Sequence, residues 1–254
     1  MSKAVFALWH REIVRFVRDR SRLSGSLLQP IIFWLLFSGA LQGSSFKPGG
    51  LDYGQYFFVG TLAMIALFTA IFSTITVIED RKEGFLQGVL VAPVPRSAIA
   101  LGKILGGATL GMGLAVIFLL LAPLAGVELH VDRVLLGLGV LALLCIAVTG
   151  LGFTLAWVMD SSAGYHGIMM LFLMPMLLLS GAFFPMQDAH WLMSWVRFVN
   201  PMTYGVGALR HALQGAAEGL PSFSVCLLGT AVFAALTFAL GTWVVTRRSA
   251  RDAA

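Results

Sequence analysis

Long apolar runs dominate the chain, and the breaks between them are short and polar. A helix needs about 20 mostly apolar residues to cross a bilayer. Six runs reach or approach this length, and each is long enough for a helix. We expect membrane spans at roughly 26–43, 55–78, 98–125, 133–159, 165–184 and 222–246. The pattern therefore predicts an all-α membrane protein, with residues 1–254 forming a single transmembrane domain.

Two segments outside these spans have a pattern of their own. Residues 1–25 place apolar side chains at helical spacing, while Arg11, Arg15, Arg18 and Arg22 follow another face at steps of three and four. This predicts an amphipathic helix lying along the membrane surface, although a positive flank that merely orients the first span is an alternative. Residues 186–220 are rich in aromatic and small residues, which predicts short helices re-entering the outer membrane face.

Composition supports lipid as the solvent. The chain is 58% hydrophobic and 11% charged, whereas soluble domains carry about 25% charged residues. A soluble core of this size could not hide so much apolar surface. The arginines of residues 1–25 also interrupt the apolar stretch that a cleavable signal peptide requires.

The distribution of basic residues predicts the orientation. All but four of the 17 lysines and arginines lie before the first span, between the second and third or at the start of the third, or after the last. The four exceptions are Lys47, Arg133, Arg197 and Arg210. Because cytoplasmic loops are enriched in lysine and arginine, we expect both termini in the cytoplasm. The expected location of the protein is a bacterial inner membrane. The net charge of +5 is then a topology signal, and nucleic acid is not an expected partner.

The segment 79–97, EDRKEGFLQGVLVAPVPRS, interrupts the apolar pattern between the second and third spans. Each charge at the bilayer centre costs about 2.5–3.5 kcal/mol, so the five charges of residues 79–83 should lie outside the hydrocarbon. The apolar residues after them are spaced as one face of a short helix, and Pro93 should end it. Such a helix either docks into a groove of a soluble partner or is an ordinary loop that fixes topology.

Two sets of residues resemble the type-two ABC export permeases, in the branch of the daunorubicin-resistance and nodulation-factor export permeases. The first set is Asp80-Arg81, Gly84-Phe85-Leu86, Leu90, Pro93 and Arg96, followed by Leu101-Gly102-Lys103. The second set is Ser180-Gly181, Phe183-Phe184-Pro185, Asn200-Pro201-Met202-Thr203-Tyr204 and Leu209-Arg210. Many relatives have an acidic residue where this chain has Gly205-Val206-Gly207, so any role of that acid is in doubt here.

The resemblance implies the membrane half of an ATP-driven exporter of an amphipathic substrate such as a drug, lipid or lipid-linked glycan. Two permease subunits would pair, a homodimer being favoured over a heterodimer, above a separate cytoplasmic ATPase dimer that binds ATP and Mg²⁺. Segment 79–97 would be the coupling helix, assisted by the first helix. The residues implied for coupling are Asp80, Arg81, Glu83, Gly84, Phe85, Leu86, Leu90, Pro93, Arg96, Arg11 and Arg15. Those implied for the substrate path and outer gate are Met174, Pro175, Ser180, Phe183, Phe184, Asn200 and Tyr204.

Other functions have weaker support in the sequence. No G-x-x-x-x-G-K-[ST] phosphate loop occurs, so no cofactor is expected on this chain. A secondary transporter usually places ionisable groups at the bilayer midplane, and the predicted span interiors are nearly free of charge. An intramembrane enzyme would need Ser180 and His166 in contact, yet 14 helical residues separate them by about 21 Å. Glycines at 102, 106, 107 and 111 form small-residue ridges for either packing within the bundle or a subunit contact.

Overall fold

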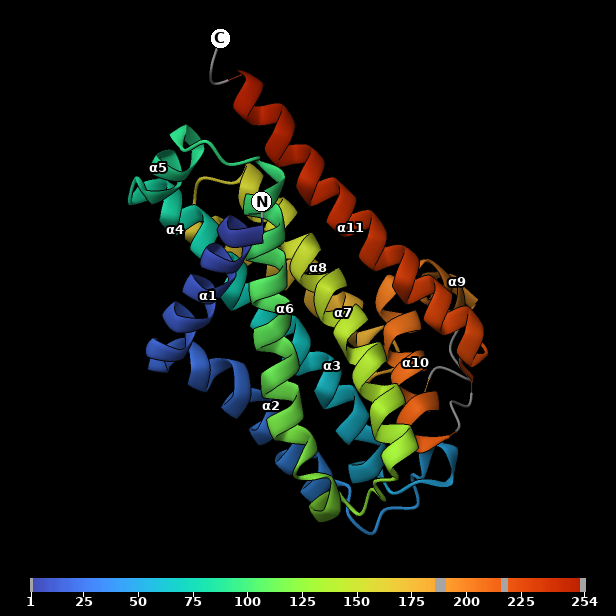
Figure 1. Ribbon diagram of the computed structural model, residues 1–254. Coiled ribbons are helices and arrows are strands. Elements are labelled where there is room, and N and C mark those ends of the chain that lie inside the picture. The colour runs from blue at the N-terminus through green and yellow to red at the C-terminus, as the bar shows by residue number, and fades with distance from the viewer. Residues whose placement is uncertain (1, 186–190, 216–218, 252–254) are drawn as a thin grey trace.

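The computed structural model describes residues 2–185, 191–215 and 219–251, and every regular element in those ranges is a helix (Figure 1). The longer helices are α1 (Ser2–Arg18), α2 (Arg20–Ala40), α3 (Tyr53–Thr74), α6 (Ser97–Leu119), α7 (Val131–Val158), α8 (Ser162–Leu178), α10 (Pro201–Gln214) and α11 (Phe223–Arg251). The shorter ones are η1 (Pro48–Gly50), α4 (Thr76–Lys82), α5 (Phe85–Val91), η2 (Ala122–Ala125) and α9 (Trp191–Val199). The predicted all-α class is confirmed.

Five helices are long and apolar enough to cross a membrane. They are Arg20–Ala40, Tyr53–Lys82, Ser97–Leu119, Val131–Val158 and Phe223–Arg247. The fifth predicted span, 165–184, is shorter than expected, because α8 has 17 residues and ends at Leu178. At about 1.5 Å per residue it is about 25 Å long, less than the roughly 30 Å of a hydrocarbon core.

Helix α3 forms the centre of the bundle. Nearly all of its side chains are buried, and it packs against α2, α6 and α7. In contrast, α2 and α11 are largely exposed, and the exposed residues include many large apolar side chains. A bundle with a packed centre and an apolar exterior fits a lipid environment or a subunit contact.

The two ends of the bundle differ (Figure 1). One end, called here the α5 end, carries α4, α5 and the C-terminal end of α11. The opposite end, called here the η2 end, carries η1, η2 and the loops that join the helices there. Helix α1 packs along the half of α6 nearest the α5 end, with Leu8 and Phe16 buried.

The boundary between the first helix and the first span lies earlier than predicted. Asp19 separates α1 from α2 and caps α2, because its carboxylate accepts a hydrogen bond from the Arg22 backbone N–H at 3.2 Å. Asp is among the preferred N-cap residues, since its oxygen satisfies an N–H group that the helix leaves open. Residues 20–25 therefore belong to the first spanning helix.

The described part of segment 186–220 contains two short helices, α9 and α10, as predicted, whereas its re-entry into the outer membrane face stays a prediction. Asn200 caps α10, its side chain accepting from the Met202 backbone N–H at 3.0 Å, and Pro201 follows at the first helical position. Residues 186–190 and 216–218, which the same prediction covers, lie outside the described residues.

The glycines of α6 pack within the chain. A methyl group at Gly102 would lie 2.6 Å from Leu8 Cβ, and one at Gly107 would lie 2.6 Å from Ser73 Oγ. The ridge that contains Gly102 thus allows α1 to pack closely on α6, and the ridge that contains Gly107 allows close packing of α3 and α7. The close-packing alternative for these ridges is the one that the structure supports.

Gly60 offers a test of this packing. A methyl group there would overlap the backbone carbonyl oxygen of Ala182, which follows α8. We expect Gly60→Ala to lower the unfolding free energy by about 1–3 kcal/mol, as overpacking does. The measurement is the melting temperature of the purified protein in detergent.

Gly139→Ala in α7 is the matched control, because a methyl group there meets nothing within 4 Å among the described residues. Its melting temperature should stay the same or rise slightly, since alanine favours helix over glycine. Equal melting temperatures for the two variants would contradict the close contact at Gly60.

Candidate functional site

A short helix, α5, lies within segment 79–97 as predicted, and its implied coupling role stays a prediction. Gly84 separates α4 from α5 with a left-handed backbone, φ 77°, which favours glycine. Helix α5 then runs over seven residues, from Phe85 to Val91. Pro93 and Pro95 lie in the connection to α6, where neither has to continue a helix. The charged residues before Gly84 belong to α4, which continues the line of the long helix α3.

The apolar face of α5 is turned largely toward the protein itself. Leu86 is 3% exposed, and Phe85, Val89 and Leu90 pack against the core. Leu86 therefore packs within the chain, and its implied part in coupling stays a prediction. The outward surface is formed by Gln87, Gly88 and Val91, and Val91 is 86% exposed.

Asp80 lies at the centre of a charged cluster and is fully buried. Arg11 binds its carboxylate with two hydrogen bonds, Nη1 to Oδ2 at 2.9 Å and Nη2 to Oδ1 at 2.7 Å. Arg15 Nη1 adds a third bond to Oδ1 at 2.5 Å. Burial lowers the pKa of the Arg11 guanidinium, but the hydrogen bond and charge of Asp80 outweigh it and raise that pKa overall. Arg11 and Asp80 thus form a fixed ion pair between α1 and α4.

A buried lysine completes the cluster. Lys103 of α6 is 4% exposed, and its ammonium pairs with Asp80 and with Glu12 Oε1, the latter at 2.7 Å. Glu12 is also buried and accepts a hydrogen bond from Thr76 Oγ1 at 2.9 Å. Charges can be buried at tolerable cost only when they are paired and hydrogen-bonded, and both conditions hold here. The cluster of Arg11, Glu12, Arg15, Asp80 and Lys103, called here the Asp80 cluster, joins α1, α4 and α6.

Arginines at the edge of the Asp80 cluster extend it toward solvent. Arg15 Nη2 binds Glu79 Oε2 at 2.9 Å and Glu83 Oε1 at 3.3 Å, and Arg22 Nη2 binds Glu79 Oε1 at 2.5 Å. The arginine face of the first helix therefore meets acidic side chains of the same chain. The predicted position of this helix along the membrane surface stays a prediction.

Arg81 fastens α4 to the connection between α7 and α8. Its guanidinium donates to the carbonyl oxygens of Trp157, at 2.5 Å, and Met159, at 3.1 Å, and pairs with Asp160 Oδ1 at 2.8 Å. A cation at a helix C-terminus satisfies carbonyl groups that the helix leaves open. Of the other residues implied for coupling, Arg96 precedes α6 at its N-cap, and Glu83 and Pro93 are exposed.

A second buried charge holds the bend that follows α8. Arg210 of α10 is 2% exposed and donates to the carbonyl oxygens of Tyr56 and Gly181, each at 3.0 Å, and of Ala182 at 2.8 Å. Tyr56 donates its own hydroxyl to Gly181 O at 2.8 Å. Arg210 has no carboxylate partner among the described residues. The guanidinium instead serves as a fork that ties α3, α10 and the bend together.

The residues implied for the substrate path divide into two groups. Ser180, Phe183 and Asn200 are buried around the bend, where Phe183 stacks on Phe57 with ring centroids 4.7 Å apart. Pro175 and Phe184 are exposed, whereas Met174 and Tyr204 are half-buried. The structure thus places the first group in the bundle interior and the second partly on its surface.

The sequence analysis missed Glu12, Lys103 and Arg210 as members of buried polar sites. Lys103 was assigned to a flank of the third span, and Arg210 to the outer side. One signal was available for Glu12, the only acid in α1, because it lies four residues from both Leu8 and Phe16 and therefore on the apolar face of the helix. Arg210 gave no such signal, because three of its partners are backbone carbonyl groups, which a sequence does not distinguish, and the fourth is the neutral side chain of Gln214.

The fold is an all-helical bundle with five long apolar helices, an amphipathic first helix and a short helix projecting from one end. These features are those of a multi-pass membrane protein. The family model of the ABC-2 type transporter matches residues 3–213, so the chain belongs to the ABC-2 transporter family of transport permeases. It is 26% identical to the transport permease ycf38 of Cyanophora paradoxa, over 81% of this chain and 72% of that protein. It is 25% identical to nodulation protein J of Rhizobium leguminosarum bv. viciae, over 96% of this chain and 95% of that protein. The predicted family is confirmed.

The Asp80 cluster allows a direct test of stability. Asp80→Asn keeps the shape of the side chain but removes the charge that Arg11, Arg15 and Lys103 share. Leaving buried cations unpaired should lower the unfolding free energy by about 3 kcal/mol or more. The change is measured as a fall in the melting temperature of the purified protein.

Asp160→Asn serves as its control, because Asp160 also pairs with an arginine of α4 but its side chain is 87% exposed. Exposed ion pairs contribute about 0–1 kcal/mol, so this variant should melt close to the wild type. A wild-type melting temperature for Asp80→Asn would show that the cluster does not stabilise the fold.

Proposed function

We propose that this chain is the permease subunit of an ATP-driven exporter in a bacterial inner membrane. In this proposal α8 is the sixth span, beside the five longer helices, and both termini are cytoplasmic. The basic residues gathered at the α5 end support this orientation. The family supports an ABC ATPase as partner, which would bind ATP and Mg²⁺ while this chain binds neither.

The observation that carries the proposal is the position of α5. This helix stands at the α5 end with Gln87, Gly88 and Val91 exposed, and its stem α4 is fastened by the Asp80 cluster. When ATP closes the ATPase dimer, a groove on it would move α5. The motion would pass to α1 and α6 through Asp80, and to the α7–α8 connection through Arg81.

Two copies of the chain would enclose the path and expose it alternately to each side of the membrane. The exposed apolar side chains of α2 and α8, among them Leu36, Leu171 and Phe172, offer a surface for a second copy. Pro175 and Phe184 would then face the path, while Ser180, Phe183 and Asn200 would hold the bend that closes its outer side. An uncharged lining suits an amphipathic substrate better than a small ion.

Val91→Asp tests the docking surface. We expect this change to lower the amount of ATPase that co-purifies with the permease by about tenfold, because 1.4 kcal/mol of lost affinity corresponds to a factor of ten. A charge in a partly apolar interface loses hydration and finds no partner. The assay is affinity purification of the tagged permease after co-expression with its ABC ATPase.

Val131→Asp is the matched control, since Val131 is 77% exposed and lies at the η2 end. Equal losses in the two variants, or none in either, would contradict docking through α5. In proteoliposomes, transport that needs a proton gradient and continues without ATP would favour the alternative, an ion-coupled secondary transporter.

A further inference from the structure

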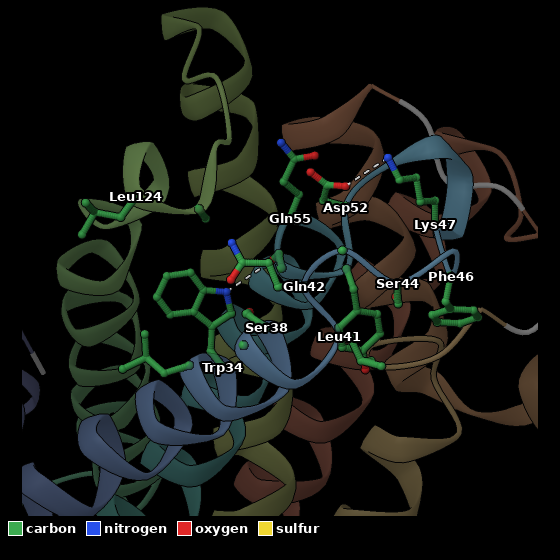
Figure 2. Close-up of a pocket in the computed structure, with 16 residues that line it drawn as sticks. Trp34, Ser38, Leu41, Gln42, Ser44, Phe46, Lys47, Asp52, Gln55 and Leu124 are labelled. Carbon is green, nitrogen blue, oxygen red and sulfur yellow. Dashed lines mark hydrogen bonds and ion pairs between the residues drawn. The ribbon is translucent and has the colours of Figure 1, made fainter.

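A cavity of about 560 Å³ lies at the η2 end (Figure 2), which is the opposite end of the bundle from α5 (Figure 1). It is bounded by the end of α2, the loop 41–47, the start of α3 and η2. Its volume falls within the roughly 300–1,000 Å³ of typical ligand pockets. We propose that this cavity binds the head group of a zwitterionic phospholipid with a primary amine, that is, phosphatidylethanolamine.

One side of the cavity is apolar and open. Leu35 and Leu124, which are 55% and 79% exposed, lie on the outer surfaces of α2 and η2. Trp34 lines the same side, as Figure 2 shows, and its indole N–H donates to Gly54 O at 3.1 Å. Its ring packs edge-on against Phe58 and Phe118, which fixes its position. A ligand seated here can therefore extend an acyl chain along Leu35 and Leu124.

The other side carries one charge of each sign. Lys47 Nζ lies 3.5 Å from Asp52 Oδ1, and Figure 2 shows the pair at the rim of the cavity. Both side chains are more than half exposed, and such pairs contribute little to stability, so the pair can separate at small cost. Lys47 would then bind a phosphate, and Asp52 an ammonium group that donates hydrogen bonds.

Two hydroxyl groups in the wall lack partners. Ser38 Oγ and Ser44 Oγ are both buried, and neither forms a hydrogen bond with the described residues. A buried donor left unsatisfied costs about 1–3 kcal/mol, whereas a hydroxyl can donate to a phosphate oxygen. The Gln42 amide also lines the cavity and adds donors for the same oxygens.

These groups together select among phospholipids. An anionic head group such as phosphatidylglycerol would bring a phosphate to Lys47 but only neutral hydroxyls, and no cation, to Asp52. Phosphatidylcholine has a quaternary ammonium, which cannot donate a hydrogen bond to the carboxylate. A primary amine on a phosphodiester offers a phosphate to Lys47 and a charged donor to Asp52, and its acyl chains would extend along the apolar side.

The experiment is native mass spectrometry of the full chain in detergent, titrated separately with phosphatidylethanolamine, phosphatidylglycerol and phosphatidylcholine. We expect phosphatidylethanolamine to bind at least about fivefold more tightly than the other two. Lys47→Ala and Asp52→Ala should each remove this preference, and Lys47→Arg should retain most of it. Lys82→Ala, which removes an exposed lysine at the α5 end, should bind as the wild type does.

Equal binding of phosphatidylglycerol would overturn the selective site and indicate attraction of any phosphate to Lys47. Equal binding of phosphatidylcholine, or a preference unchanged by Lys47→Ala and Asp52→Ala, would equally overturn it. The melting temperature of each variant without added lipid establishes that it is folded. The assay contains no ATPase and measures no transport, so its outcome is independent of the proposed exporter function. The orientation in that proposal determines only which leaflet supplies the lipid.

Discussion

The carboxylate of Asp80 binds three cations from two other helices, Arg11, Arg15 and Lys103. A buried carboxylate in this position would be very costly alone, and so would the buried lysine. The carboxylate and the cations stabilise one another only when α1, α4 and α6 are packed together. Helix α5 follows directly after α4, so the position of α5 depends on the same cluster.

Because of this dependence, α4 and α5 are held together as one unit at the α5 end. Helix α5 has seven residues and cannot be stable by itself, because isolated helices this short do not form in water. Its direction is set by the turn at Gly84, by burial of Leu86 and by Arg11, whose guanidinium lies 3.6 Å from the centre of the Phe85 ring. The same arginine thus contacts both the stem and the short helix, which makes the two parts one body.

At the other end of α3, Arg210 plays a comparable structural part with different chemistry. It binds carbonyl oxygens in place of carboxylates: one is that of Tyr56 in α3, and two, those of Gly181 and Ala182, belong to the bend after α8. A polar backbone buried in an apolar bundle must find donors within the protein. The guanidinium supplies them in a fixed fork, so the bend after α8 can remain buried. Helix α3 therefore joins two polar anchors through an apolar middle.

Much of this architecture could be predicted from the sequence. The spans, the α5 helix and the short helices of 191–214 follow from hydrophobic periodicity, proline and glycine, all of which act locally. The α8 boundary was predicted too late because residues 179–184 are apolar but form a bend held by Arg210. The sequence could not predict that Leu86 packs within the chain, because an apolar side chain can pack on its own chain or on a partner with the same spacing.

The sequence by itself determined that the chain is helical, needs lipid, and carries a charged segment that the hydrocarbon must exclude, because these properties are sums over local residues. Only the tertiary structure decided which charges meet. Asp80 lies 69 residues from Arg11 and 23 from Lys103 along the chain, and their pairing depends on how three helices pack. The pairing depends on contacts such as the one between α1 and the glycine-lined surface of α6. No local sequence pattern specifies which helices make these contacts.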